Sequence, residues 1–216
     1  MTINYAVLNP AGNITILVTT PVKETDRRFV ASKIMKVEPS AEQVGFIEGN
    51  NLNMAGGEFC GNAVRCTSFY LNLSEVVCTG KTIKCEGTAA YIPNDIEGID
   101  HFIFEEMIDN PEEKIKEEAK GRAIGYMFFN EKESSLKPLV HVPNIDYLLW
   151  EQSCASGTAA LGKYLVEKYN KEIDLDVKEP GGVLHITGRP GDGYIKLDGD
   201  IILEKEGSIC IQELNY

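Results

Sequence analysis

The sequence predicts an α+β protein built from two similar lobes. Both halves of the 216-residue chain follow the same order: strands, a loop of small residues with a cysteine, a helix, then further strands. Turn-forming residues at 93–95 separate the halves. We therefore expect an N-terminal lobe over residues 1–93, which carries Cys60, and a C-terminal lobe over residues 94–216, which carries Cys154.

In the first half, β-branched and alternating apolar residues predict strands, and helical spacing of apolar residues predicts two helices. The first two strands should form a hairpin through a turn at residues 9–13. The expected strands are residues 5–8, 14–20, 44–48, 82–85 and 89–92, the helices are 29–37 and 60–73, and a loop covers 49–57.

The second half repeats this plan. Acidic residues open one expected helix and lysines close it, as the helix dipole favours. A turn at residues 180–182 precedes a closing meander of three strands. The expected strands are residues 101–105, 123–129, 136–142, 183–187, 194–197 and 201–204, and the helices are 111–120 and 156–168.

The charge balance excludes some classes of partner. The chain has 33 acidic and 21 basic residues, a net charge of −12. Such a surface repels phosphates, so we expect neither a nucleic-acid nor an anionic-membrane partner. The sequence shows no secretory leader and no membrane-spanning apolar run, so a cytoplasmic location is expected.

The six cysteines show no CxxC pair, which disfavours a zinc ribbon or a thioredoxin-type motif, and no metal is expected. A disulfide framework is improbable in the cytoplasm. Four of the cysteines are interpreted as small buried hydrophobic residues, Cys66, Cys78, Cys85 and Cys210.

The other two cysteines, Cys60 and Cys154, share a distinctive setting. Each is followed by small residues and then by a helix-forming stretch. This places a thiol at the first turn of a helix, where free backbone N–H groups and the positive end of the dipole are expected to lower its pKa. Two such thiols facing one another can remove a proton from one face of a carbon and return it to the other face.

Several segments, in order along most of the chain, resemble the diaminopimelate epimerase fold family. Their residues are most similar to those of its histidine racemase branch. The segments are Asn9-Pro10-Ala11-Gly12-Asn13, Glu42-Gln43-Val44-Gly45-Phe46, Glu58-Phe59-Cys60-Gly61-Asn62-Ala63, Trp150-Glu151-Gln152-Ser153-Cys154-Ala155-Ser156-Gly157-Thr158 and Pro180-Gly181-Gly182. The resemblance implies two pseudo-symmetric lobes, each a β-barrel-like sheet around a central helix. It also implies a homodimer that needs neither pyridoxal phosphate nor a metal.

The resemblance also implies roles for particular residues. Cys60 and Cys154 would be the acid and the base. Backbone donors beside them would bind the substrate carboxylate, and three amide side chains would hold the amino and carboxylate groups. The expected substrate-binding residues are Asn13, Gln43, Gly61, Asn62, Ala155 and Ser156.

The chain departs from the family pattern near the second cysteine and in the middle of the sequence. Diaminopimelate epimerases carry an Arg-Gly-x-Gly-Glu stretch before that cysteine, whereas here Glu151-Gln152-Ser153 leads directly into Cys154. Diaminopimelate is therefore disfavoured. Glu151 is either an acceptor for a substrate imidazole or a surface residue, and His101 is either a site residue or a structural one. The family also carries more sequence than this chain around residues 90–95.

The leading hypothesis is an amino-acid racemase that interconverts L- and D-histidine by proton transfer between two thiols. One alternative is an epimerase of diaminopimelate or of a related diamino acid. Two alternatives of another class remain, a non-catalytic amino-acid-binding protein and a thiol redox sensor.

Overall fold

The structure is a computed structural model that describes residues 1–212. Its first-half elements are β1 (Thr2–Pro10), β2 (Thr15–Val18), α1 (Glu24–Val37), β3 (Gln43–Glu48), β4 (Asn51–Met54), α2 (Gly61–Leu71), β5 (Glu75–Cys78), β6 (Lys81–Glu86) and β7 (Ala89–Pro93). The second-half elements are β8 (Ile99–Phe104), α3 (Pro111–Ala119), β9 (Ala123–Asn130), β10 (Ser135–Val142), the short helix η1 (Pro143–Ile145), β11 (Tyr147–Trp150), α4 (Ala155–Tyr169), β12 (Ile173–Glu179), β13 (Gly182–Gly188), β14 (Tyr194–Asp198) and β15 (Ile201–Cys210).

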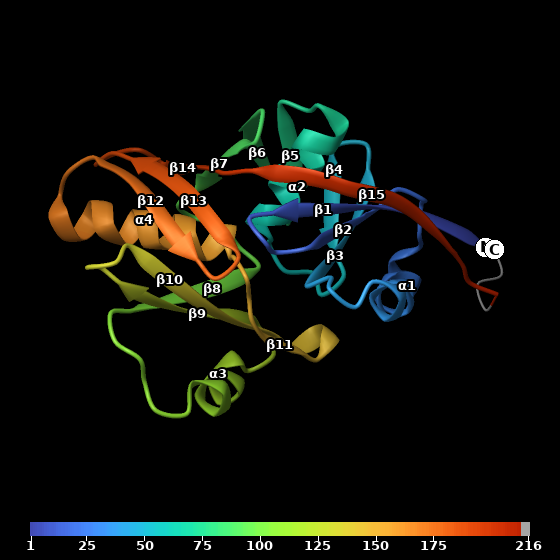
Figure 1. Cartoon of the computed structure of the whole chain (residues 1–216), viewed down its shortest axis with the longest axis horizontal. Coiled ribbons are helices and arrows are strands. Elements are labelled where there is room, and N and C mark those ends of the chain that lie inside the picture. The colour runs from blue at the N-terminus through green and yellow to red at the C-terminus, as the bar shows by residue number, and fades with distance from the viewer. Residues whose placement is uncertain (213–216) are drawn as a thin grey trace.

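The strands form one continuous sheet that curls around two helices (Figure 1). The strand order is β15-β1-β2-β3-β4-β5-β6-β7-β14-β13-β12-β10-β9-β8, with β11 beside β10. The halves join where β7 pairs antiparallel with β14, with Ile92 opposite Ile195. Helix α2 contacts strands of the first half, and α4 contacts β8, β9, β12, β13 and β14. The predicted α+β class, with one central helix in each half, is confirmed.

Strand β15 returns to the first half of the chain. It pairs antiparallel with β1, from Thr2 opposite Cys210 to Pro10 opposite Ile201, and crosses the molecule in Figure 1. The expected closing meander is therefore wrong in its last strand, because β14 pairs with β13 and β7 and leaves no edge for β15. The division of the chain at residues 93 and 94 stays a prediction.

The two central helices are buried because of their small side chains. In α2, every residue from Gly61 to Ser68 is buried, and α4 begins with a run of buried small residues. A helix without a polar face is stable only when other elements surround it. Arg65 of α2 is fully buried, and its guanidinium donates to the carbonyl oxygens of Thr88 and Gly199 and to Oδ1 of Asn62.

Some elements differ from the prediction. The expected loop at 49–57 contains β4, which forms a tight hairpin with β3 through Gly49, where φ is 65°. Helix α1 begins at Glu24, before residue 29, and β11 and β12 were not predicted. The turn formers of the loop and the alternating charges of β12 give no strong apolar signal for a strand, although each of these strands pairs with a neighbour in the sequence.

The cysteines are all free thiols, and the burial prediction is correct for three of the four structural ones. Cys66, Cys78 and Cys85 are buried, whereas Cys210 is exposed. The expectation for Cys210 is wrong because it lies at the end of β15, whose outer residues face solvent along the sheet edge.

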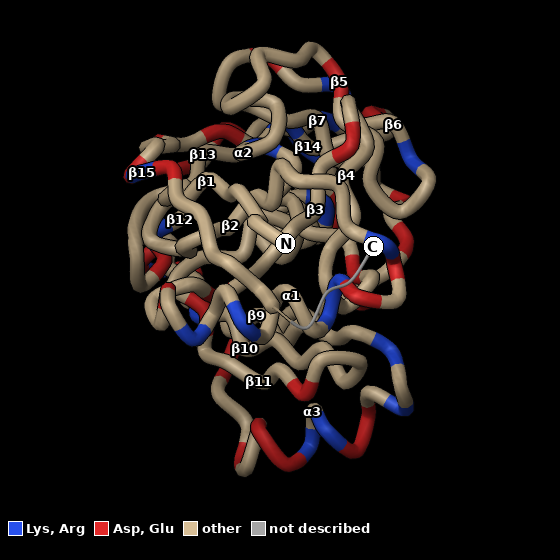
Figure 2. Tube along the Cα trace, turned by 90° about the vertical axis from the view of Figure 1, so that its right-hand side faces the viewer, with Lys and Arg blue, Asp and Glu red and all other residues tan. Residues whose placement is uncertain are grey.

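The surface carries both signs of charge. Figure 2 shows acidic and basic residues interspersed along the peripheral segments, for example on α3. Among the helices within residues 1–212, none has the length and apolar character needed to cross a membrane.

Candidate active site

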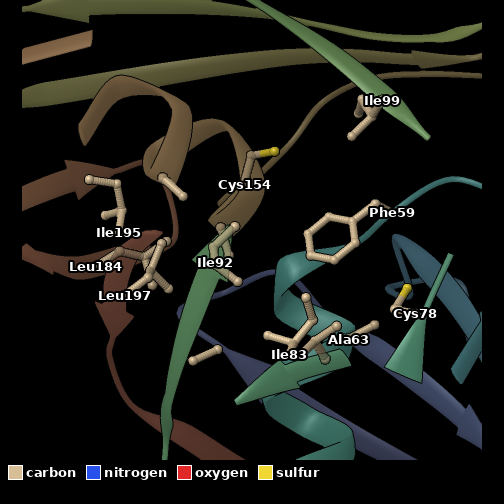
Figure 3. Packing of buried hydrophobic residues seen from close by; sticks show 14 of the residues in the cluster. Phe59, Ala63, Cys78, Ile83, Ile92, Ile99, Cys154, Leu184, Ile195 and Leu197 are labelled. Carbon is tan, nitrogen blue, oxygen red and sulfur yellow. The ribbon is translucent and has the colours of Figure 1, made fainter. Parts of the chain in front are cut away.

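Both singled-out cysteines line the same cavity, which has a volume of about 380 Å³. Cys60 and Phe59 contribute from the first half, and Cys154 and Ile99 contribute from the second. In Figure 3 the sulfur of Cys154 points from the start of α4 toward the side on which Phe59 and Ile99 lie. The fold therefore brings together two thiols that are far apart in the sequence.

Each cysteine is the N-cap of a central helix, as the sequence predicts. Cys60 precedes α2 and Cys154 precedes α4, both with extended backbone, and Sγ of Cys60 accepts the N–H of Ala63 at 3.4 Å. The two helix starts are in close contact. A Cβ at Gly61 would lie 3.0 Å from Cβ of Ala155. Two positive helix ends, with N–H groups not used inside the helices, therefore converge beside the cavity.

A network of amides surrounds Cys60. Its thiol donates to Oε1 of Gln43 at 2.8 Å, and Nε2 of Gln43 donates to Oδ1 of Asn13. Asn62 donates to the same Asn13 oxygen at 3.2 Å. Gln43 and Asn62 line the cavity, whereas Asn13 is fully buried behind them and donates to Glu42. Asn13 thus orients the two amides that face the cavity.

Cys154 is held by the second half of the chain. Its backbone N–H donates to Oε2 of Glu179 at 2.7 Å, and its Sγ lies 3.6 Å from Oγ of Ser156. Ser156 and Ala155 line the cavity. His101 borders a different pocket, and its Nε2 lies 3.2 Å from Oγ of Ser156. Burial lowers the pKa of His101 to about 4, so its imidazole is neutral.

The predicted substrate-binding residues thus divide into two groups. Gln43, Asn62, Ala155 and Ser156 line the cavity with the two cysteines, whereas Asn13 and Gly61 do not line it.

Across residues 1–212, no group of three or more His, Cys, Asp or Glu side chains is arranged to hold a metal ion.

Three buried glutamates line the cavity, and sequence reasoning identified only one of them. Burial, with the nearby charge of Glu42, raises the pKa of Glu151 to about 8, and its carboxyl accepts the Tyr147 hydroxyl at 3.0 Å. Burial also raises the pKa of Glu58 to about 7 and that of Glu42. Glu42 and Glu58 fall inside segments that carry the family resemblance, but isolated acids beside turns give no periodic signal of burial.

The pKa of each thiol is raised well above its ordinary value, which contradicts the sequence-based expectation. Burial is the largest cause for both. The charge of Glu151 acts in the same direction on both thiols, joined by Glu58 at Cys60 and by Glu179 at Cys154. The helix N–H groups lower the pKa, but desolvation and the carboxyl charges outweigh them.

Several solved structures share the fold. A protein of Pseudomonas aeruginosa described as a predicted epimerase superposes with a TM-score of 0.67 at 8% identity, covering 97% of this chain and 100% of that one. A hydroxyproline epimerase from Agrobacterium vitis gives 0.63 at 8% identity, covering 96% and 92%. A phenazine biosynthesis protein of the PhzF family from Enterococcus faecalis gives 0.62 at 14% identity, covering 98% and 100%. These three structures show that the whole chain adopts a fold that is already known.

Sequence similarity identifies the family and with it the class of racemases. The family model for the histidine racemase CntK N-terminal domain matches residues 2–105 and, a second time, residues 95–209. A histidine racemase of Fusobacterium nucleatum is 31% identical and one of Staphylococcus aureus is 27% identical. The first alignment covers 97% of each chain, and the second covers 87% of this chain and 89% of its relative. The chain belongs to the histidine racemase family, and it is an isomerase.

The relatives carry residues that this chain lacks. The Fusobacterium alignment extends over 260 residues, more than the 216 of this chain, although it covers 97% of each protein. The shorter length agrees with the departure noted in the sequence. Its position around residues 90–95 stays a prediction.

Proposed function

We propose that this protein interconverts L- and D-histidine by moving the α-proton between Cys60 and Cys154, without pyridoxal phosphate or a metal. One observation carries the proposal: two cysteines that each cap a central helix line a single cavity of about 380 Å³. The names of the sequence relatives, both histidine racemases, support the choice of substrate.

The helix starts supply the groups that stabilise the reacting carboxylate. Loss of the α-proton gives the carboxylate enediolate character, so negative charge grows on its oxygens. Backbone N–H groups at the beginning of α2, near Asn62, and of α4, near Ser156, are oriented toward such an anion. A cavity that excludes water strengthens these interactions.

The proton transfer needs one thiolate and one thiol on opposite faces of the α-carbon. The thiolate takes the α-proton and forms an S–H bond, while the opposite thiol gives its proton to the carbanion. The two cysteines therefore exchange protonation states in each turnover. Burial and carboxyl charges favour the neutral form of both thiols. The substrate ammonium, held near Glu151, would supply the positive charge that favours ionisation of one of them.

A panel of L-amino acids in heavy water tests the proposal. L-Histidine should gain α-deuterium, detected by NMR, and should lose its optical rotation. Absence of α-deuterium in histidine would overturn the proposal. Histidine that binds without exchange would favour a non-catalytic binding protein. Racemisation by the oxidised protein at the rate of the reduced protein would contradict proton transfer by the two thiols.

A second candidate is an epimerase of diaminopimelate or a related diamino acid. Arg28, an exposed residue of α1, lines the cavity and offers a guanidinium to a distal carboxylate. Diaminopimelate therefore belongs in the same panel. Faster α-deuteration of diaminopimelate than of histidine would favour this candidate.

We further propose that the enzyme works in the cytoplasm as a homodimer. The buried free thiols support a reducing compartment, where cysteines stay unpaired. Cell fractionation tests the location, and analytical ultracentrifugation tests the oligomeric state. Recovery of the protein outside the cytoplasm would contradict the proposed location. A monomer at working concentration would contradict the proposed dimer.

A further inference from the structure

Glu58 presents an unused acceptor in the wall of the cavity. The residue is only 8% exposed and lines the cavity, and its Oε2 has no hydrogen-bond partner within residues 1–212. A buried carboxylate oxygen without a donor is unfavourable, so most such atoms in proteins have a partner. A donor from a bound molecule would satisfy this oxygen.

The preceding loop fixes the position of this carboxyl group. A Cβ at residue 56 would lie 2.5 Å from Oε2 of Glu58 and 2.6 Å from Cγ1 of Val142, so Gly56 is required for the observed packing. The amide of Asn144 donates to the Gly56 carbonyl at 3.0 Å and ties the loop to η1. The carboxyl group is thus held in place from both halves of the chain.

The other two cavity glutamates already have donors. Glu42 accepts the side-chain N–H of Asn13 and, at 3.3 Å, the backbone N–H of Gln152. Glu151 accepts the hydroxyl of Tyr147 at 3.0 Å. Among the cavity carboxyls, Glu58 is the one with a fully buried oxygen that has no donor within residues 1–212.

We propose that Glu58 selects the substrate side chain, with its Oε2 accepting a ring N–H of the histidine imidazole. This inference rests on the proposed function. Glu58 lies two residues before Cys60, so one short segment holds both the ring acceptor and a reacting thiol. Apolar side chains that line the same cavity, among them Val44 and Val142, suit the faces of a flat ring.

A second pocket provides a competing role for Glu58. Glu58 also borders an open pocket lined by Arg27. The Nε of Arg27 is buried and has no partner in the described part of the chain, and its Nη2 donates to Glu48 at 2.9 Å. If Glu58 serves only that outer surface, its replacement will not change which side chains the enzyme accepts. The two roles therefore predict different substrate preferences.

The experiment compares L-histidine with L-β-(2-thienyl)alanine, whose five-membered ring has no N–H. Glu58→Leu removes the acceptor, and Glu58→Gln keeps a weaker, uncharged one. Glu75→Gln, at an exposed position of β5, is the matched control. Solvent-deuterium exchange gives kcat and KM for each substrate and each protein.

Glu58→Leu should lower kcat/KM for histidine by about 10- to 100-fold, mainly through KM, because a hydrogen bond to a charged group is lost. Glu58→Gln should give a smaller loss. Loss of the Glu58 charge also changes the pKa of the Cys60 thiol, which acts on both substrates alike, so the measure is the ratio of kcat/KM for histidine to that for thienylalanine. Thienylalanine exchange also shows that each variant is folded. Glu75→Gln should match the wild type for both substrates.

Two results would overturn the inference alone: an unchanged ratio between the two substrates in Glu58→Leu, or an equal loss for both substrates in both Glu58 variants. If the wild-type protein exchanges no α-proton of L-histidine, the proposed function fails, and the inference fails with it.

Discussion

The contact between Gly61 and the start of α4 predicts that Gly61→Ala impairs catalysis more than it impairs folding. A Cβ at this position would lie 3.0 Å from both Cβ of Ala155 and the backbone N of Ser156. Ordinary van der Waals contacts are 3.4–4 Å, so the two helix starts must separate by a few tenths of an ångström. Backbone atoms cannot rotate away from the new methyl group, and the two N-caps would shift with their helices.

The expected magnitudes follow from this displacement. Overpacking of this kind destabilises a protein by about 1–3 kcal/mol, and replacing a helical glycine with alanine regains up to about 1 kcal/mol. The free energy of unfolding should therefore fall by about 0–3 kcal/mol. A misplacement of about 1 Å at a reacting centre reduces rates by about 100-fold, so a few tenths should reduce kcat by about 10-fold.

Gly162→Ala is the matched control, because its Cβ would lie 3.0 Å from Cγ2 of Ile195, within α4 but away from the cavity. Urea unfolding measures stability, and α-deuterium exchange measures kcat. Gly61→Ala should lose activity while Gly162→Ala keeps it. The reasoning is refuted if kcat of Gly61→Ala stays within twofold of the wild type, or if both variants lose activity equally.

Three further predictions concern stability. Burial raises the pKa of Glu151 from 4.5 to about 8, so the folded state holds a proton that the unfolded chain releases, and stability should fall as pH rises between these values. In Glu151→Gln the urea midpoint should differ less between pH 5 and pH 8 than it does in the wild type. An equal difference in both proteins would contradict the prediction. Arg65→Met should lower the free energy of unfolding by about 2–4 kcal/mol, because buried acceptors lose their donor; the exposed control Arg122→Met should lower it by less than about 1 kcal/mol, and an equal loss would refute the reasoning. Cys210→Ser should change the urea midpoint and the exchange rate very little, since its thiol is exposed, and a clear loss of either would contradict that placement.

The helix caps could be predicted because their signal is local. A cysteine, two or three small residues and an apolar helical pattern lie together in the sequence, and both Cys60 and Cys154 take the N-cap position. The pKa of each thiol could not be predicted in the same way. It depends on burial and on the charges of Glu151 and Glu179, which only the folded chain brings near.

Long-range pairing explains the remaining differences from the sequence prediction. The residues of β15 favour a strand, but only the completed sheet shows that β1 is its partner. The sequence could not show that Asn13 is fully buried and accepts hydrogen bonds from Gln43 and Asn62, and its role in substrate binding stays a prediction. Glu58 was missed because an acid after two glycines is typical of an exposed turn, whereas in the folded chain it is buried, and both its carboxyl group and Val142 of the other half pack against Gly56.

The most direct test of the two-thiol mechanism is racemisation of L-histidine by Cys60→Ala and by Cys154→Ala, with Cys66→Ala as the control. Cys66 lies fully buried on the same helix that Cys60 caps, so its variant reports the effect of removing a buried sulfur outside the cavity. The racemisation rate of each cavity variant should fall by about 100- to 10,000-fold, while Cys66→Ala stays active. Racemisation near the wild-type rate by either cavity variant would contradict the mechanism.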